Sequence, residues 1–477
     1  MRNQANGSVA ARIENLPLTK FHRRFVGLVS LGNFFDLYDI FIVAYLGAAL
    51  QHSGFLSLRQ FTWFVAAGFL GMFVGTVVFG MGSDRMGRRS AFILLLLIYS
   101  VFTFADALAP TAPWLIGLRF CAGVGIGAEI VVIDAYVTEV VPSAARGRYV
   151  AITQVVGFCA VPVAAVLARL LVPTHWIISG WRWVMLLGAS GALLTWWFRR
   201  SLPESPRWLE SRGRFAEAHA VMTVLEAENF AASDRSDARL VAKDGKTAAE
   251  RIPTEAAASE KARKSISLPA HSPAREQGSF RELWRQPYLS RTAMLVLFQA
   301  LQTIGFYGFA NWAPTFLLKQ GVSLLHSLEY TMLIAFMSPV GPLLAAWTSD
   351  RLERKWTIVV LSTLVAGLGL AFGNSVAPAA VVLFGAMLNL ANYWFSAAFH
   401  AYQAELFPTR LRATGVGFTY SWSRLSAALS SILIGAVLVR GVPAVFAMLA
   451  VAMSLVALVI GFFGPKTNRM MLEEISA

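Results

Sequence analysis

Long apolar runs without charged side chains dominate this sequence and restrict what it can fold into. AFILLLLIYSVFTFA, from Ala91, and AVFAMLAVAMSLVALVIGFFG, from Ala444, are apolar almost throughout. A helix needs about 20 mostly apolar residues to cross a bilayer, whereas the strands of an outer-membrane barrel alternate apolar and polar residues. Only 14% of the 477 residues are charged, where a soluble domain carries about a quarter. The sequence therefore predicts an all-α protein embedded in the lipid bilayer.

Glycine, proline and charged residues divide the apolar runs into twelve predicted spans. They lie near residues 25–50, 62–82, 90–109, 113–138, 148–171, 181–199, 291–318, 327–348, 356–374, 377–403, 412–439 and 442–464. A polar linker separates two six-helix bundles, which gives domains at 1–200, 201–290 and 291–477. Within the linker, residues 205–228 are expected to form a surface helix, and residues 233–265 are expected to be flexible because they lack apolar periodicity.

The basic residues that produce the net charge of +14 indicate how the chain is oriented. They cluster in alternate connections between spans, at Arg85, Arg88 and Arg89, at Arg146 and Arg148, and at Arg410 and Arg412. Loops rich in Lys and Arg stay in the cytoplasm, so an even number of spans puts both termini there. We expect the bacterial inner membrane, because the short loops show no eukaryotic targeting signal. A nucleic-acid function is excluded, since no aromatic and basic patch is available for it.

Residue patterns of cofactor, metal and hydrolytic sites are missing from the sequence. Cys121 and Cys159 both lie in apolar spans, which argues against a disulfide framework or a metal set. Neither a Walker motif nor a G-x-S-x-G elbow occurs, and the glycines of the second and fourth spans are expected to permit close helix approach. We therefore expect no cofactor, no metal and no enzyme activity.

Two separate motifs recur at the same offset along the chain. GSDRMGRR around Asp84 returns as TSDRLERK around Asp350, which is 350 − 84 = 266 residues later. The same offset of 266 relates Glu139, Pro142 and Arg146 to Glu405, Pro408 and Arg412. The bundles are thus predicted to be two copies of one six-helix unit. In such proteins a substrate site forms between the repeats near the midplane, and the halves rock around it.

These motifs resemble the major facilitator superfamily, and within it the sugar-porter-like and metabolite:proton symporter branches. GSDRMGRR matches G-x-x-x-D-R-x-G-R-R, and LPESPRWL matches the sugar-porter signature at residues 203–209. RFCAGVGIG from Arg119, followed by Tyr136 and Glu139, is similar to the fourth and fifth spans of that branch. The resemblance covers nearly the whole chain apart from the flexible part of the linker. It implies a secondary transporter that works by alternating access.

Charged residues of these motifs are expected to form a cytoplasmic latch that a rocking motion breaks. At a helix end, Asp84 can accept hydrogen bonds from backbone amides of the neighbouring helix and pair with arginines. The second latch is expected to be weaker, because Glu353 replaces Gly87. The alternative is that these charges only satisfy the positive-inside rule. The predicted latch residues are Asp84, Arg85, Gly87, Arg88, Arg89, Glu139, Arg146, Asp350, Arg351, Glu405 and Arg412, with Glu204 and Arg207 added by the resemblance.

Ionisable residues within spans are costly and therefore point to function. Asp36 and Asp39 lie about 60° apart on one helix face, since a helix turns about 100° per residue. Asp39 resembles the first-span acid of proton-coupled sugar porters, and Arg119 resembles the arginine paired with it. We expect protonation of Asp39 to release Arg119; the alternative is a permanent ion pair. Asp36 is expected to share in proton coupling, and Glu129 is a candidate second proton site.

Arg424 lies deep in the eleventh span with no acid within helical reach on that span. Two interpretations stay open: it binds an anionic group of the substrate, or it pairs with an acid of another helix. The seventh span only partly matches the Q-Q-x-x-G-x-N pattern of sugar porters, which argues against a hexose. Further residues expected to bind substrate are Tyr38, Gln154, Gln302, Tyr307, Asn311, Asn389 and Asn392.

The expected function is proton-coupled uptake of a small polar metabolite, with an organic or aromatic acid favoured over a sugar. The protein is expected to act as a monomer whose partners are the substrate, protons and the lipid bilayer. A proton-coupled or passive sugar transporter and a membrane sensor that moves nothing are the alternatives.

Overall fold

The computed structural model describes residues 9–14, 16, 18, 20–200, 202–226, 280–348, 351–408 and 411–467. Helices form each of the twelve predicted spans. In the first half they are α2 (Lys20–His52), α3 (Leu58–Met86), α4 (Arg88–Ala107), α5 (Ala112–Val140), α6 (Ser143–Phe158) with α7 (Ala160–Leu171), and α8 (Gly180–Arg199). Within the described residues, ten helical stretches are long and apolar enough to cross a membrane, and α5 and α8 fill the other two predicted spans.

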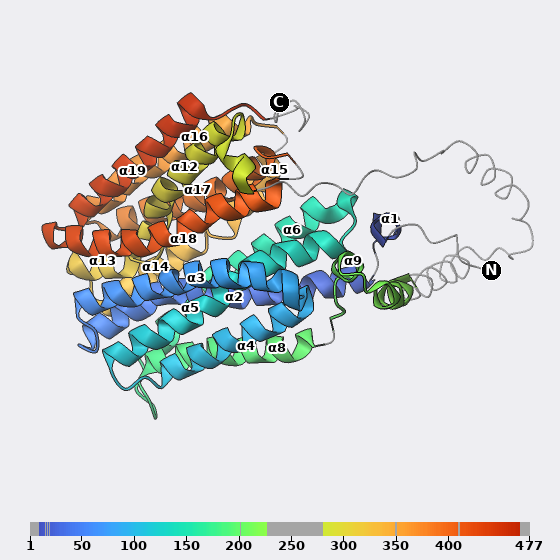
Figure 1. Cartoon of the computed structure of the whole chain (residues 1–477). Coiled ribbons are helices and arrows are strands. Elements are labelled where there is room, and N and C mark those ends of the chain that lie inside the picture. Colours follow the sequence, from blue (N-terminus) through green and yellow to red (C-terminus); the bar gives the residue numbers. More distant parts are fainter. Residues whose placement is uncertain are drawn as a thin grey trace, which may run out of the picture.

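The second half repeats this arrangement. Its helices are α12 (Tyr288–Ala310) with α13 (Ala313–Lys319), α14 (Leu324–Ala335) with α15 (Val340–Thr348), α16 (Arg354–Gly373), α17 (Pro378–Glu405), α18 (Arg412–Val437) with η3 (Leu438–Arg440), and α19 (Val442–Phe463). Short elements precede the halves, namely α1 (Val9–Glu14) before the first and η2 (Phe280–Trp284) before the second. Figure 1 shows the halves as two layers, with α2 to α8 in one and α12 to α19 in the other.

Three of the predicted spans are each built from two helices. α6 ends four residues before Pro162, and α12 ends four residues before Pro314. The third break, between α14 and α15, likewise precedes Pro342. Proline has no N–H, and its ring crowds the carbonyl four residues earlier, so the helix is interrupted at that distance. Broken spans of this kind leave backbone groups available near the centre of the bundle.

Close approach of α3 to α5 makes the first half compact. A Cβ atom on Gly71 would lie 2.1 Å from the carbonyl oxygen of Phe120, and one on Gly127 would lie 2.1 Å from that of Met72. Only glycine fits at these positions, which confirms the close approach expected from the sequence. The two helices are therefore in direct backbone contact.

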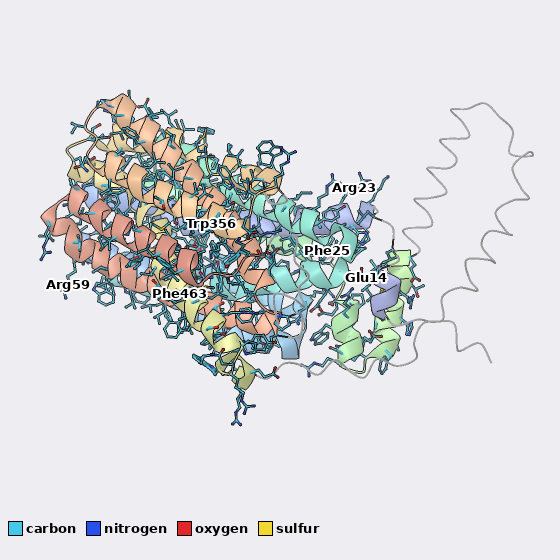
Figure 2. The ribbon with its side chains drawn as sticks, turned by 90° about the horizontal axis from the view of Figure 1, so that it is seen from above. Glu14, Arg23, Phe25, Arg59, Trp356 and Phe463 are labelled. Atoms are coloured by element: carbon cyan, nitrogen blue, oxygen red, sulfur yellow. The ribbon has the colours of Figure 1, made fainter. Side chains whose placement is uncertain are left out.

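Polar contacts between the halves are found at one end of the molecule, in addition to the ring contacts of Phe41 and Phe69 with Tyr307. We call the end that carries α1 and α9 (Pro206–Ser211) the linker end and the opposite end the far end (Figure 1). Arg59, at the start of α3, lies at the far end, well away from Glu14 (Figure 2). There the halves touch through a hydrogen bond from Gln51 to Thr315 (3.3 Å), an ion pair between Arg169 and Glu329 (3.9 Å), and ring packing of Phe61 on Trp312 (4.9 Å between centroids).

A small cluster of helices covers the linker end of the first half. The predicted surface helix consists of α9 and a helix over residues 215–226, separated by a turn at Gly213 with φ of +72°. α1 packs against both, with Ile13 fully buried and Arg12 bonded through Nε and Nη2 to Glu226 at 2.9 and 2.8 Å. The Glu226 carboxylate raises the pKa of Arg12 above its usual value. The predicted flexible segment, residues 233–265, lies outside the described residues.

Candidate functional site

Asp39 and Arg119 form a buried ion pair between α2 and α5. Nη1 of Arg119 donates to Oδ2 of Asp39 at 2.6 Å, and its Nη2 donates to the backbone oxygen of Asp39 at 2.8 Å. Thr103 on α4 donates to the other carboxylate oxygen at 3.2 Å. Both charged side chains are 2% exposed. The structure thus brings together the two partners that the sequence suggested.

Asp106, near the end of α4, adds a second carboxyl group beside this pair. It is fully buried, and its electrostatic neighbours are Arg119 and Asp39. Neither of its oxygens has a hydrogen-bond partner among the described residues. Sequence reasoning missed Asp106; the available signal was a lone acid close to the end of the third apolar run.

A second buried cluster lies nearer the linker end of the same half. Arg199, the last residue of α8, forms an ion pair with Glu129 of α5, and both side chains have no exposed surface. Asp36 of α2 lies against Glu129 and is also fully buried. The guanidinium stacks on Phe92, with Cζ 3.6 Å from the ring centroid. Arg199 was missed because an arginine at the end of a span ordinarily reaches the membrane surface.

Arg424 is the buried arginine of the second half, and it is held by two tyrosines. Its Nη1 donates to the hydroxyl of Tyr307 on α12 at 2.8 Å, and its Nη2 donates to that of Tyr420 on α18 at 2.9 Å. The side chain is 2% exposed. Within the part of the chain that the structure describes, Arg424 forms no ion pair with a carboxylate. Pairing with an acid of another helix, the alternative that the sequence left open, is thus not seen in those residues.

Aromatic rings from both halves surround this arginine. Phe69 of α3 lies 4.7 Å from Tyr307 between centroids, and Phe41 of α2 stacks on the same tyrosine at 6.3 Å. His400 of α17 is exposed and meets Tyr420 edge-on, with centroids 5.6 Å apart. The surroundings of Arg424 therefore combine one positive charge with flat apolar surfaces.

The other polar residues predicted to bind substrate occupy different places. Tyr38 donates to the backbone of Val184 within the first half, and Gln302 donates to Gln299 within the second. Gln154 is half-buried on α6. Asn389 donates to the backbone of Ile334, and Asn392 donates to that of Phe306. Asn311, at the break between α12 and α13, lines a small pocket that also contains Arg119. Of these residues, Tyr307 alone contacts Arg424 through a hydrogen bond that the described residues show.

The predicted latch residues Glu139 and Glu405 form equivalent ion pairs in the two halves. Arg88 pairs with Glu139 at 3.1 Å and Arg354 with Glu405 at 3.2 Å, and the 266-residue offset relates both partners. Gly87 has φ of +96°, and a Cβ there would lie 2.4 Å from Glu204.

The remaining latch residues take less symmetrical positions. Glu204 accepts from the backbone N–H of Arg89 at 3.0 Å within the first half, and Arg207 pairs with Glu14 at 2.8 Å. Arg351 stacks on Trp347. Outside the described part lie Asp350 and the side chains of Asp84, Arg85, Arg146 and Arg412.

Comparisons with known proteins identify the family. The family model for sugar (and other) transporters matches residues 25–477. The niacin transporter NiaP of Acinetobacter baylyi is 31% identical, with 98% of this chain and 99% of that protein covered. The inner membrane metabolite transport protein YdjE of Escherichia coli is 30% identical, with 98% of each chain covered. A partially occluded inward open structure of the E. coli xylose transporter XylE shares the fold, with a TM-score of 0.71, 17% identity and coverage of 94% of this chain and 100% of that one. The chain therefore belongs to the sugar (and other) transporter family of the major facilitator superfamily and is a multi-pass secondary transporter.

Proposed function

We propose that this transporter imports a small organic anion together with protons, and that aromatic carboxylates are its preferred substrates. The observation that carries the proposal is Arg424, a buried guanidinium whose described partners are the hydroxyls of Tyr307 and Tyr420. A buried charge without an opposite charge is strongly unfavourable, and neutral hydroxyls do not neutralise it. A substrate carboxylate would supply the missing charge.

The geometry of Arg424 suits a carboxylate. A guanidinium has five N–H donors, and the two tyrosines use two of them. The donors that remain can bind both oxygens of a carboxylate, which is the strongest pairing available to arginine. Phe41 and Phe69 supply flat apolar surfaces beside the charge. That NiaP is named a niacin transporter supports a substrate with an aromatic ring and a carboxylate.

Proton coupling is assigned to Asp39 and Arg119. Protonation of Asp39 removes the charge that holds Nη1 of Arg119. The guanidinium also has an Nε without an acceptor, and Asn311 has an Oδ1 without a donor, among the described residues. Both side chains line one small pocket where the halves meet. A change in the charge of Asp39 thereby affects Asn311, at the break between α12 and α13 in the other half.

The linker end is assigned to the cytoplasm and the far end to the outside, in a bacterial inner membrane. The basic motif around Arg88 and Arg89 lies at the linker end, as the positive-inside rule requires. The pairs Arg88–Glu139 and Arg354–Glu405 each stay within one half, while Arg169 and Glu329 join the halves at the far end. This pattern fits a state closed to the outside. One chain supplies every residue invoked, so a monomer is sufficient.

The test is uptake into proteoliposomes that contain the purified protein. Niacin and nicotinamide share a ring and differ in a carboxylate against a carboxamide, so they form a matched pair. We expect niacin to accumulate when the outside is acidic and nicotinamide not to. Accumulation of xylose or glucose without niacin uptake would instead indicate that the protein transports sugars. If niacin equilibrates across the membrane and its final distribution does not depend on the pH gradient, the protein is a passive carrier.

A further inference from the structure

Two buried carboxyl groups lie side by side between α2 and α5 and face a single positive charge. Asp36 and Glu129 have no exposed surface, and they are neighbours. Glu129 uses Oε1 for its ion pair with Arg199. Its Oε2 and both oxygens of Asp36 have no hydrogen-bond donor among the described residues.

We propose that Asp36 and Glu129 form a proton-binding site that holds one proton between them. With both groups ionised, two negative charges would face one guanidinium in a place that water does not reach. Like charges at such a distance in a low-dielectric site do not both stay ionised. One proton, taken from water, turns Asp36 into an acid whose O–H donates to Oε2 of Glu129. The cluster is then neutral, and Oε2 of Glu129 and one oxygen of Asp36 are joined by a hydrogen bond.

This site is separate from the pair assigned to transport coupling. The charged groups that act on Asp36 are Glu129, Arg199 and Asp39. Asp39 has its own counter-charge in Arg119 at 2.6 Å and so makes no use of Arg199. Within the described part of the chain, no further charged group is seen to act on Asp36.

One uncharged neighbour is Tyr99 on α4, whose hydroxyl donates to the backbone of Phe35. The Asp36–Glu129 site can therefore hold its proton whether or not Asp39 couples transport to protons.

The shared proton stabilises the end of α8, where the first half joins the linker. Arg199 is the last residue of α8, and its guanidinium occupies the space left by Gly32 of α2, where a Cβ would lie 1.1 Å from Nη2. The chain then leads directly to Glu204, which accepts from the backbone of Arg89. A neutral cluster keeps Arg199 on Glu129 and holds α2, α5 and α8 together beside the latch.

Infrared spectroscopy of the full-length protein in nanodiscs tests the site, because a protonated carboxylic acid has a carbonyl stretch distinct from that of a carboxylate. We expect such a band in the wild-type protein at neutral pH. Asp36→Asn removes the acid and should remove a component of this band. Glu129→Gln should remove the same component, since Asp36 then ionises to pair with Arg199. Loss of no component in either variant would overturn the proposal.

Thermal unfolding of the same variants provides a second measurement. In Asp36→Asn and in Glu129→Gln, a neutral amide takes the place of one of the two carboxyl groups that share the proton. The melting temperature of either single variant should therefore be close to that of the wild type. The double variant Asp36→Asn, Glu129→Gln leaves Arg199 without a counter-charge and should lose far more than the sum of the single losses. Additive losses would contradict a shared proton. Asp39→Asn is the matched control on the same helix, and it should leave the Asp36 component of the band in place.

Discussion

Arg119 holds Asp39 at two points, the carboxylate oxygen Oδ2 at 2.6 Å and the backbone oxygen at 2.8 Å. The first bond depends on the charge of the carboxylate, and the second does not. Protonation of Asp39 therefore weakens one bond and leaves Arg119 anchored to α2 by the other. This arrangement permits a change of charge without separation of α2 from α5.

Asp39→Asn should abolish uphill uptake while substrate exchange continues. The amide keeps the shape of the side chain and mimics the protonated acid, so the carrier can reorient but takes no energy from the proton gradient. Proteoliposomes should show counterflow of labelled substrate without accumulation above the outside concentration. Full accumulation in this variant would remove Asp39 from the coupling mechanism.

Arg119→Gln should lower stability strongly, because it leaves buried carboxylates without their cation. Removal of one partner of a buried ion pair costs about 3–5 kcal/mol. Thermal unfolding in detergent measures the loss. Arg169→Gln is the matched control, since its partner Glu329 is 42% exposed at a distance of 3.9 Å. That change should alter stability by less than about 1 kcal/mol.

Arg424→Gln should weaken the uptake of an anionic substrate much more than the binding of a neutral analogue. A hydrogen bond to a charged group contributes about 1.5–3 kcal/mol, which corresponds to a rise of about ten- to a hundredfold in KM. Initial rates with niacin measure the effect, and binding of nicotinamide provides the comparison. Arg424→Lys keeps the charge but loses the two-pronged geometry, so an intermediate KM is expected. Equal losses for both ligands would assign Arg424 to structure.

Gly435→Val should hold the far end of the molecule open. A Cβ at this position would lie 2.3 Å from Oγ1 of Thr62 in the other half. The halves then cannot close there, so the population of the state closed at the far end decreases. A cost of ~1.4 kcal/mol reduces that population tenfold, and transport should fall by about tenfold or more. Gly417→Val on the same helix is the control, because a Cβ there meets nothing within 4 Å. Cysteine labelling at Gln51→Cys reports the opening, and unchanged labelling would argue against closure of the far end at Gly435.

Ile13→Asp should release α1 from the linker end. Ile13 is fully buried among apolar side chains of α9 and its neighbour helix, where a carboxylate would lose its hydration. Limited trypsin digestion should then cut faster at Arg23 and Arg24. The half-buried pair Arg12–Glu226 lies near the surface, where an ion pair contributes about 0.2–1 kcal/mol, so Arg12→Ala should give a smaller increase. Identical digestion of all three proteins would contradict this docking.

Hydropathy predicted the twelve-helix fold because each span must satisfy its backbone groups within itself, which leaves a long apolar run in the sequence. The breaks at Cys159 and Asn311 were not predicted. A proline inside an apolar run is tolerated in some membrane helices and interrupts others, and packing around the freed carbonyls decides between the two.

Within the candidate site, sequence reasoning found charges in the middle of spans and missed those at their ends. Asp39 and Arg119 stand deep in apolar runs, where a charge needs a function or a partner. Asp106 and Arg199 stand at helix ends, where side chains commonly reach water, so nothing marked them as buried. Tyr38 and Asn389 illustrate the converse difficulty. A polar residue in a span can line a cavity or form a hydrogen bond to a neighbouring helix, and the sequence does not distinguish the two. In the structure both residues bond to a neighbouring helix.

The uneven distribution of charge between the bundles separates two proposed roles. The ionisable clusters built on Asp36 and Asp39 belong wholly to the first bundle, whereas Arg424 and its tyrosines belong wholly to the second. If the proposed roles hold, substitutions in the second bundle alter the charge that receives the substrate and leave the Asp39–Arg119 pair unchanged, while Phe41 and Phe69 of the first bundle still line one side of the same place. A chimaera that joins this first bundle to the second bundle of a relative with another cargo tests this separation of roles.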